Sequence, residues 1–203
     1  ISADFAYCNA SSVDTPDIKG NGGAIYVNGT DTHVYGSHFL NCTAMNDGNG
    51  GAIYIEGLNT IVETSRFENT WTSDNGKGGA IYIEGSNATV KTSEFIGSHA
   101  RQGGAIYIEG VNTTVTDSTF TRTNVGTSCE WGGASYGNAS DYVPPIAGDG
   151  GAIYIYGANT HIENATIDTT YATQHGGAIY VEGPDAIISA TIQNSYAGLD
   201  ESS

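Results

Sequence analysis

Residues 50–57 read Gly-Gly-Ala-Ile-Tyr-Ile-Glu-Gly, and this 203-residue chain repeats those eight residues five more times with few changes. The six copies begin at Gly22, Gly50, Gly78, Gly103, Gly150 and Gly176, at successive separations of 28, 28, 25, 47 and 26 residues. A repeat of this length is one supersecondary unit that buries its apolar face only by stacking on its neighbours. The repeat therefore predicts a solenoid that forms a single domain over residues 1–203.

The copy at Gly50 indicates which structure each unit adopts. Residues 52–56 alternate with period two, which is typical of a half-buried strand with Ile53 and Ile55 inside and Tyr54 and Glu56 outside. A glycine-containing turn and a second extended stretch follow, and no 3.6-residue helical spacing occurs in the chain. We therefore expect an all-β, right-handed parallel β-helix of about six to seven turns, with like residues stacked about 4.8 Å apart.

Two further columns of the aligned repeats complete the predicted core. The aliphatic column reads Val34, Val62, Val90, Val115, Ile162 and Ile187, and the aromatic column reads Phe39, Phe67, Phe95, Phe120, Ile167 and Ile192. A turn column of Asp31, Asn59, Asn87, Asn112, Asn159 and Asp185 fits the tolerance of Asn and Asp for left-handed backbone.

Residues 37–44, Ser-His-Phe-Leu-Asn-Cys-Thr-Ala, have the pattern S-x-F-x-N-x-x-A one turn after GGAI, and residues 65–69 keep its S-x-F-x-N part. This combination resembles the repeats of polymorphic outer-membrane proteins and adhesin-like surface proteins. The resemblance implies a β-helical surface passenger, covers nearly the whole chain, and carries no catalytic residue with it. Ile167 and Ile192 depart from the aromatic position.

The composition favours an extracellular protein. Twenty-two Asp and Glu residues against six Lys and Arg give a formal net charge of −16, which disfavours nucleic acid and anionic membrane as partners. No apolar run approaches the length of a membrane-spanning helix, and a chain that begins at Ile1 is expected to be a processed protein or a fragment. Seven N-x-S/T sequons fit secretion, and our glycosylation candidates are Asn9, Asn28, Asn41, Asn138 and Asn164.

The outward aromatic column is the first candidate interaction surface. It comprises Tyr26, Tyr54, Tyr82, Tyr107, Tyr154 and Tyr180. These rings are either a ladder that stabilises the sheet by stacking, or a platform for sugars or a protein partner, including lateral burial against another subunit. We favour the structural interpretation.

The next outward column reads Asn28, Glu56, Glu84, Glu109, Tyr156 and Glu182. Carboxylates at strand spacing repel one another, so Glu56, Glu84 and Glu109 need cations between them, raised pKa values or splayed side chains. Oxygen ligands suit calcium, but the spacing of dedicated calcium motifs is missing, which favours splayed, solvated side chains over a metal site.

Cys8 and Cys42 both lie three residues after a residue of the aromatic column and therefore occupy one column in adjacent turns. Strand spacing falls within the range of a disulfide bond, so we predict that the two are bonded, against the alternative of two small buried thiols. Cys129 has no partner in this scheme.

One interval between repeats is long because residues 125–149 form an insertion, which we expect to be a loop. Its aromatic residues Trp131, Tyr136 and Tyr142 are further candidates for contact with another molecule, since long loops on rigid scaffolds often carry recognition. The alternative is a loop that folds over the solenoid and shields it.

Catalysis finds little support in the sequence. A polysaccharide lyase or hydrolase on a β-helix needs clustered carboxylates with a basic residue, yet Arg66 and Lys91, the basic residues nearest a strand face, fall in different columns. We find no nucleophile motif, zinc spacing or phosphate loop, and we expect neither catalysis nor a cofactor.

The sequence thus favours a secreted structural protein that assembles head to tail with copies of itself into a cell-surface filament. Neither end of the repeat array carries a predicted polar cap, and stacking of unlike ends generates an open polymer. The alternative is an adhesin fragment that binds a carbohydrate or a protein through the tyrosine column or the 125–149 loop.

Overall fold

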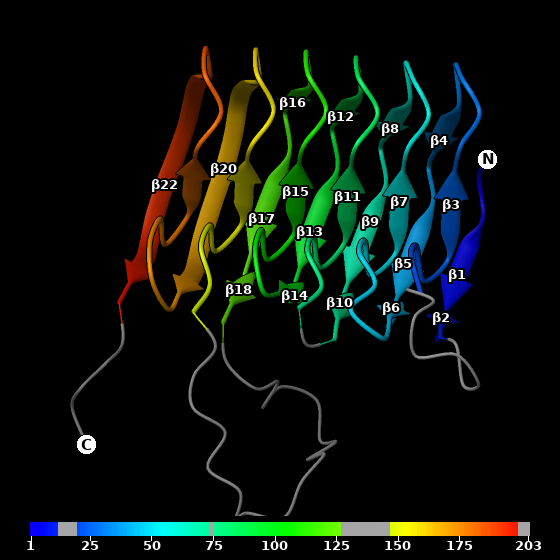
Figure 1. The fold of residues 1–203 in the computed structure, drawn as a ribbon, viewed down its shortest axis with the longest axis horizontal. Coiled ribbons are helices and arrows are strands. Elements are labelled where there is room, and N and C mark those ends of the chain that lie inside the picture. The colour runs from blue at the N-terminus through cyan, green and yellow to red at the C-terminus, as the bar shows by residue number, and fades with distance from the viewer. Residues whose placement is uncertain (12–19, 74, 127–146, 199–203) are drawn as a thin grey trace, which may run out of the picture.

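The computed structural model describes residues 1–11, 20–73, 75–126 and 147–198. It is an all-β parallel solenoid, confirming the predicted fold class (Figure 1). We call each turn of the coil a rung. Rungs stack from β1 at one end of the molecule to β22 at the other, and no helix that could cross a membrane is found in the described ranges.

The GGAI repeats form a six-stranded parallel sheet. Its strands are β3 (Ile25–Val27), β7 (Ile53–Ile55), β11 (Ile81–Ile83), β15 (Ile106–Ile108), β19 (Ile153–Ile155) and β21 (Ile179–Val181). Each tyrosine pairs with the tyrosine of the next rung, so the predicted column is confirmed. Five complete turns separate the first of these strands from the sixth, slightly fewer than the six to seven that the sequence predicts.

The rest of each rung belongs to a sixteen-stranded sheet that bends around the core in three rows. The first row is β4 (His33–Tyr35), β8 (Ile61–Glu63), β12 (Thr89–Lys91) and β16 (Thr114–Thr116). The second is β1 (Asp4–Ala6), β5 (His38–Leu40), β9 (Arg66–Glu68), β13 (Glu94–Ile96) and β17 (Thr119–Thr121). The third is β2 (Asn9–Ala10), β6 (Thr43–Ala44), β10 (Trp71–Thr72), β14 (His99–Ala100) and β18 (Asn124–Val125). All three rows continue in β20 (His161–Ala172) and β22 (Ile187–Ala197).

In the rungs before β20 the chain after the GGAI strand therefore forms not one strand but three short ones, whereas β20 and β22 each span all three rows. The backbone turns between the short strands at residues in the left-handed region, for example Thr64 at φ 53° and Asn69 at φ 51°. A residue in this region changes the direction of the chain at a single position. These changes of direction close the coil around its core. Strand alternation in the sequence does not reveal these bends, because they carry Thr, Asn or Asp more often than Gly.

The core is built from the columns that the sequence predicts. Phe39, Phe67, Phe95 and Phe120 are fully buried, as are the paired isoleucines of β7, β11, β15 and β19. The phenylalanine rings stack with centroids 4.7 to 4.8 Å apart.

One member of the aliphatic column was wrong. Ile162 pairs with Ile188, while Ile187 pairs with the outward-facing His161. The register shifts immediately afterwards, because the last rung has one residue between Ile188 and Ala190 where the rung before has two between Ile162 and Ala165. Alignment from the C-terminal side therefore misplaces this position by one residue.

Most of the variation in length among the rungs lies at one corner. From the first glycine of a repeat to the second residue of the third-row strand the chain advances 22 positions in five rungs, as from Gly50 to Thr72, and 21 in the last, from Gly176 to Ala197. The corner that follows holds the remaining variation, including the insertion. Thr119 still pairs with Thr166 across the insertion, so the stacking is undisturbed.

Candidate interaction surface

The tyrosine column lies outside the core but is largely covered. Tyr54, Tyr82, Tyr107 and Tyr154 are 3% to 8% exposed and form a hydrophobic cluster of their own, with Tyr180 packed against it. Their rings stack with centroids 4.8 to 5.2 Å apart, and only Tyr26, at the end of the column, is 50% exposed. Little of the ring faces along the column is therefore accessible to a ligand. This favours a stacked ladder that stabilises the sheet over a binding platform for sugars or a protein.

Hydrogen bonds between rungs explain how the glutamate column tolerates its charges. The hydroxyls of Tyr26, Tyr54, Tyr82 and Tyr154 donate to Glu56, Glu84, Glu109 and Glu182, in each case to the carboxylate of the next rung. Each bond delocalises carboxylate charge into a neutral donor and holds the side chain in place. Within the described residues no group of three acidic, histidine or cysteine side chains is placed to hold a metal ion. Calcium at Glu56, Glu84 and Glu109 stays the less favoured interpretation of the sequence.

Burial raises the pKa of the tyrosines. For Tyr54, Tyr82 and Tyr154 the loss of hydration is the largest cause, and the hydrogen bond to a carboxylate adds to it. The pKa of the exposed Tyr26 is also raised, mainly by its bond to Glu56. Both causes act in the same direction because a tyrosinate would lose water and face a negative charge.

Tyr107 is the exception in this ladder. Its next-rung neighbour in the glutamate column is Tyr156, so no carboxylate stands opposite its hydroxyl. Lys77 takes that place, with its Nζ 3.1 Å from the Tyr107 hydroxyl and 4.4 Å from the ring centroid. A cation over an aromatic face thus already occurs within this surface.

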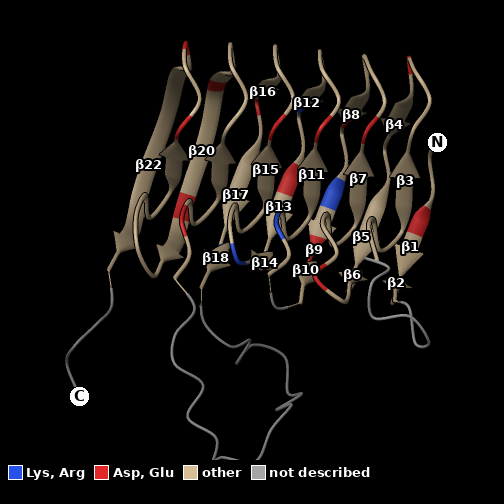
Figure 2. Cartoon of the chain, viewed as in Figure 1, with Lys and Arg blue, Asp and Glu red and all other residues tan. Residues whose placement is uncertain are grey.

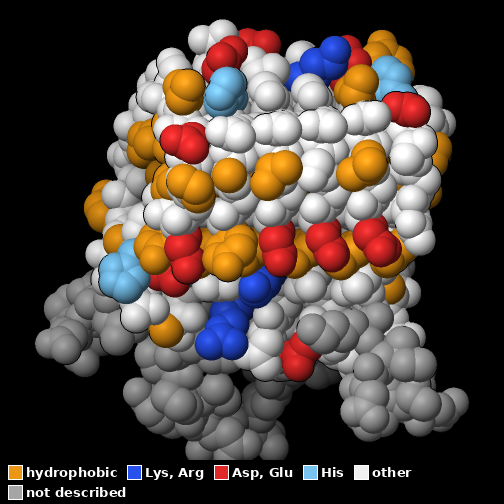
Figure 3. Space-filling model, turned by 45° about the horizontal axis from the view of Figure 1, so that its top comes forward, with side chains coloured by type: hydrophobic (Ala, Val, Ile, Leu, Met, Phe, Trp, Pro, Cys, Tyr) orange, Lys and Arg blue, Asp and Glu red, His pale blue; other side chains and the backbone are white. Residues whose placement is uncertain are grey.

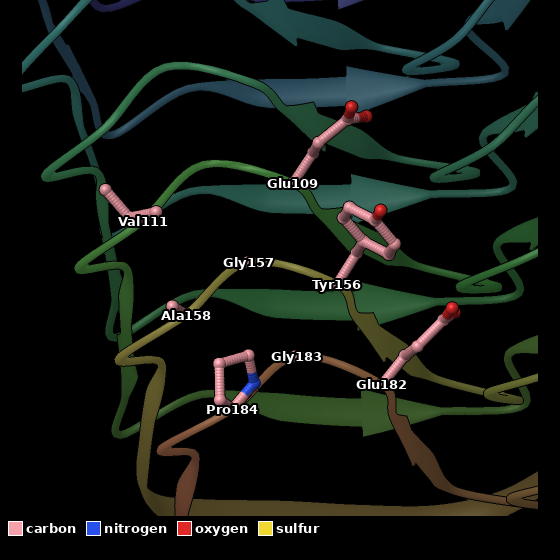
Figure 4. Close-up of a pocket in the computed structure, with 8 residues that line it drawn as sticks. All are labelled: Glu109, Val111, Tyr156, Gly157, Ala158, Glu182, Gly183 and Pro184. Carbon is pink, nitrogen blue, oxygen red and sulfur yellow. The ribbon is translucent and has the colours of Figure 1, made fainter.

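Tyr156 interrupts the row of carboxylates that runs along the stack in Figure 3. The ring is 51% exposed and lies between Glu109 of the rung before and Glu182 of the rung after. It forms part of a shallow groove of about 380 Å³ (Figure 4). The groove is lined by Glu109, Val111, Tyr156, Gly157, Ala158, Glu182, Gly183 and Pro184.

Sequence reasoning named Tyr156 only as a member of the glutamate column and did not identify this groove. The available signal was the column itself, in which Tyr156 is the single aromatic residue. The glycine floor has a steric cause: a Cβ on Gly157 would lie 2.2 Å from the carbonyl oxygen of Gly110, and one on Gly183 would lie 2.3 Å from that of Tyr156.

The predicted turn column forms an amide ladder that bears on the glycosylation candidates. Asn59 donates from Nδ2 to Asp31, Asn87 to Asn59, Asn112 to Asn87 and Asn159 to Asn112, over 3.0 to 3.2 Å. The sequon residues Asn87 and Asn112 therefore already use their amide nitrogens.

The glycosylation candidates themselves lie in different settings. Asn9 and Asn28 are exposed, Asn41 is half-buried at φ 53°, and Asn164 donates to Asp117 over 3.3 Å. Asn138 lies outside the described residues. Glycosylation at any of these positions stays a prediction.

Cys8 and Cys42 are neighbours in adjacent rungs, as predicted. The Thr43 N–H donates to the Cys8 carbonyl over 2.8 Å, and Asn9 pairs with Thr43. Cys42 is fully buried, which raises the pKa of its thiol to about 12. Both cysteines are free thiols in the structure, and their oxidation to a disulfide stays a prediction.

Part of the predicted insertion belongs to the solenoid. Val125 ends β18, and Asp149 bridges Gln102 and His175 in the neighbouring rungs. Residues 127–146, with Cys129, Trp131, Tyr136 and Tyr142, lie outside the described residues, so their proposed role in contacts is untested.

The basic residues are few, and those on the sixteen-stranded sheet lie among carboxylates (Figure 2). Arg66 forms ion pairs with Glu68 and Glu94, and Lys91 pairs with Glu63 over 3.2 Å. All of these side chains are partly exposed, so the pairs contribute little to stability.

No family profile, curated protein or solved structure matches this chain. Its function must therefore be argued from the geometry described above.

Proposed function

We propose that this protein is an extracellular structural subunit that polymerises head to tail by stacking its β-solenoid on further copies. The composition, the sequons and the resemblance to the repeats of polymorphic outer-membrane and adhesin-like proteins support a surface location. The sequence offers no nucleophile motif, zinc spacing or phosphate loop that would favour an enzyme instead.

The observation that carries this proposal is the contrast between the last described rung and the one before it. Ile188 and Ile192 of β22 are 41% and 47% exposed, whereas their partners Ile162 and Ile167 are completely buried. At the other end Phe5 is only partly buried, although it stacks on the fully buried Phe39. A further rung at either end would bury apolar surface and pair free strand edges.

The two ends are unlike surfaces, so a contact between them repeats without closing and yields a filament. The inner column can continue across such a junction, because Phe5 of one copy would follow Ile192 of another.

The test is polymerisation of the chain over a range of concentrations, followed by sedimentation velocity and negative-stain microscopy. Ile192→Lys should abolish polymers because it places a charge in the end face, while circular dichroism stays unchanged. Thr191→Lys is the matched control, since Thr191 continues a column whose previous member, Thr166, is exposed.

A wild-type chain that stays monomeric at high concentration would contradict the proposal. The adhesin-like alternative would then take its place. The covered tyrosine column disfavours that alternative in its original form, but the groove at Tyr156 gives it a specific surface.

A further inference from the structure

We propose that the groove at Tyr156 binds an arginine side chain of a basic peptide segment, with the guanidinium over the tyrosine ring and between Glu109 and Glu182. This inference does not rest on end-to-end polymerisation, because the groove opens on the side of the stack, between Glu109 and Tyr156 of two inner rungs and Glu182 of the last described rung.

The aromatic ring is the centre of the site. Tyr156 is half exposed, whereas the four inner rings of the neighbouring tyrosine column, from Tyr54 to Tyr154, are almost covered. It replaces a residue that is Glu in four rungs and Asn in one. Its hydroxyl makes no hydrogen bond to any described residue. An exposed aromatic face in a groove attracts a cation through the ring quadrupole.

The two carboxylates reinforce this preference. Tyr82 and Tyr154 donate to Glu109 and Glu182, which fixes both side chains at the edges of the groove. Within the described part of the chain neither carboxylate forms an ion pair with a lysine or arginine. The groove therefore holds two uncompensated charges on a protein of net charge −16.

The hydrogen-bonding groups select arginine over a sugar. The backbone N–H groups of Tyr156 and Gly157 donate to Ile108, and those of Glu182 and Gly183 donate to Ile155, so these four N–H groups are not available to a ligand. The groove presents carboxylate acceptors, with the Tyr156 hydroxyl as its one side-chain donor. A guanidinium carries five donors and no acceptor, whereas sugar hydroxyls need both kinds of partner.

The apolar rim has a role as well. Val111, Ala158 and Pro184 line the side of the groove opposite the carboxylates in Figure 4. They can pack against the aliphatic stem of an arginine, which keeps its charged head at the ring and the carboxylates.

The test titrates the chain with an acetylated tri-arginine amide and follows binding by calorimetry and by the NMR signals of isotope-labelled tyrosine. The key variant is Tyr156→Glu, which restores the residue found at this position in four other rungs and is expected to fold. It adds a negative charge but removes the ring. We expect affinity to fall roughly threefold to tenfold, while Tyr156→Phe stays within about twofold of wild type.

Glu182→Gln should weaken binding about two- to fivefold and reduce its salt dependence. If Tyr156→Glu does not fold, Tyr156→Asn, the residue of the first rung, replaces it. Unchanged or tighter binding by the ring-deleted variant would overturn the proposal in favour of bulk electrostatic attraction. Absence of peptide binding at millimolar concentration would also overturn it, as would a neutral oligosaccharide that binds wild type in place of the peptide.

Discussion

Two stacks of aromatic rings run along this solenoid, one inside it from Phe5 to Phe120 and one outside it from Tyr26 to Tyr180. The phenylalanine stack, which begins at Phe5, has centroids 4.7 to 5.0 Å apart, and the tyrosine stack has centroids 4.8 to 5.2 Å apart. The spacing is set by the same strand ladder in both cases. The difference lies in the hydroxyl, which ties a tyrosine to the carboxylate of the next rung.

That difference separates two ways of holding rungs together. The inner stack stabilises by removing apolar surface from water, and no charge enters it. The outer stack is buried by its own neighbours, carries hydrogen bonds along the axis, and contains groups that titrate. Conditions that ionise tyrosine should therefore break the outer stack and leave the chemistry of the inner one untouched.

Alkaline pH should give the largest effect. Tyr54, Tyr82, Tyr107 and Tyr154 have raised pKa values in the folded protein and the ordinary value of 10.0 when unfolded. Their contribution is fully present below pH 10 and is lost as pH rises, because only the unfolded chain releases these protons. At pH 11 the loss should be about 1.4 kcal/mol for each tyrosine. Denaturant titrations from pH 8 to 11 measure it.

Tyrosinate absorbance at 295 nm supplies the control for this prediction. The buried tyrosines should ionise only together with the loss of the β-sheet circular dichroism signal. Ionisation of all thirteen tyrosines near pH 10 in a still-folded protein would show that the outer stack is not covered in solution.

Truncation of the inner stack should come next in size. Phe67→Ala removes a fully buried ring between Phe39 and Phe95 and should lower the free energy of unfolding by about 3–5 kcal/mol. Glu68→Ala, on the outward side of the same strand, should cost about 1 kcal/mol or less. A loss below about 1 kcal/mol for Phe67→Ala in urea denaturation would mean that the two faces are assigned the wrong way round.

Removal of a single hydroxyl should give the smallest effect. Tyr82→Phe keeps the stacked ring but leaves Glu109 without its donor, so we expect a loss of about 1 kcal/mol. Tyr26→Phe deletes the equivalent bond to Glu56 at an exposed position and should cost less than about 0.5 kcal/mol. Equal losses for the two variants would argue that burial does not strengthen the tyrosine–glutamate bond.

The sequence predicted the coil and its columns because the repeat is strict. The tyrosine register, the buried phenylalanines and the adjacency of Cys8 and Cys42 all follow from the equal spacing of residues within each rung. The error at Ile187 arose in the one rung that is a residue short, where equal spacing fails.

The sequence did not predict how deeply the outward side chains are buried or which hydrogen bonds they form. Period-two alternation places Tyr54 and Glu84 on the outer face, but it does not tell that stacked neighbours cover the ring or that the hydroxyl reaches the next rung. The groove at Tyr156 was missed for a related reason. The sequence shows that Tyr156 stands where most rungs have a glutamate. The consequence becomes visible only when the pairing between rungs is known, because the Tyr107 hydroxyl then has no carboxylate opposite it.

At the corner between Val125 and Gly150 the chain can vary in length without a change in how the rungs stack. An added Cβ on Gly148 would lie 2.9 Å from the Cα of Gly126, so the chain leaves and re-enters the coil at almost one point. The entropic cost of closing a loop between two such close points increases only slowly as the loop lengthens. The same corner spans two residues between Ala100 and Gly103.

We therefore expect the solenoid to accept an inserted peptide at this corner without changes to its rungs. A foreign peptide grafted between Ala100 and Gly103 would enter the chain at the same corner as the natural insertion does one rung later, and the arcs of the rungs would keep their lengths. A deletion of one residue within the arc is a different event, since it removes a left-handed bend and shifts the pairing register, as happens between Ile188 and Ala190 in the last rung. Natural insertions and engineered ones can therefore use the same corner of the coil.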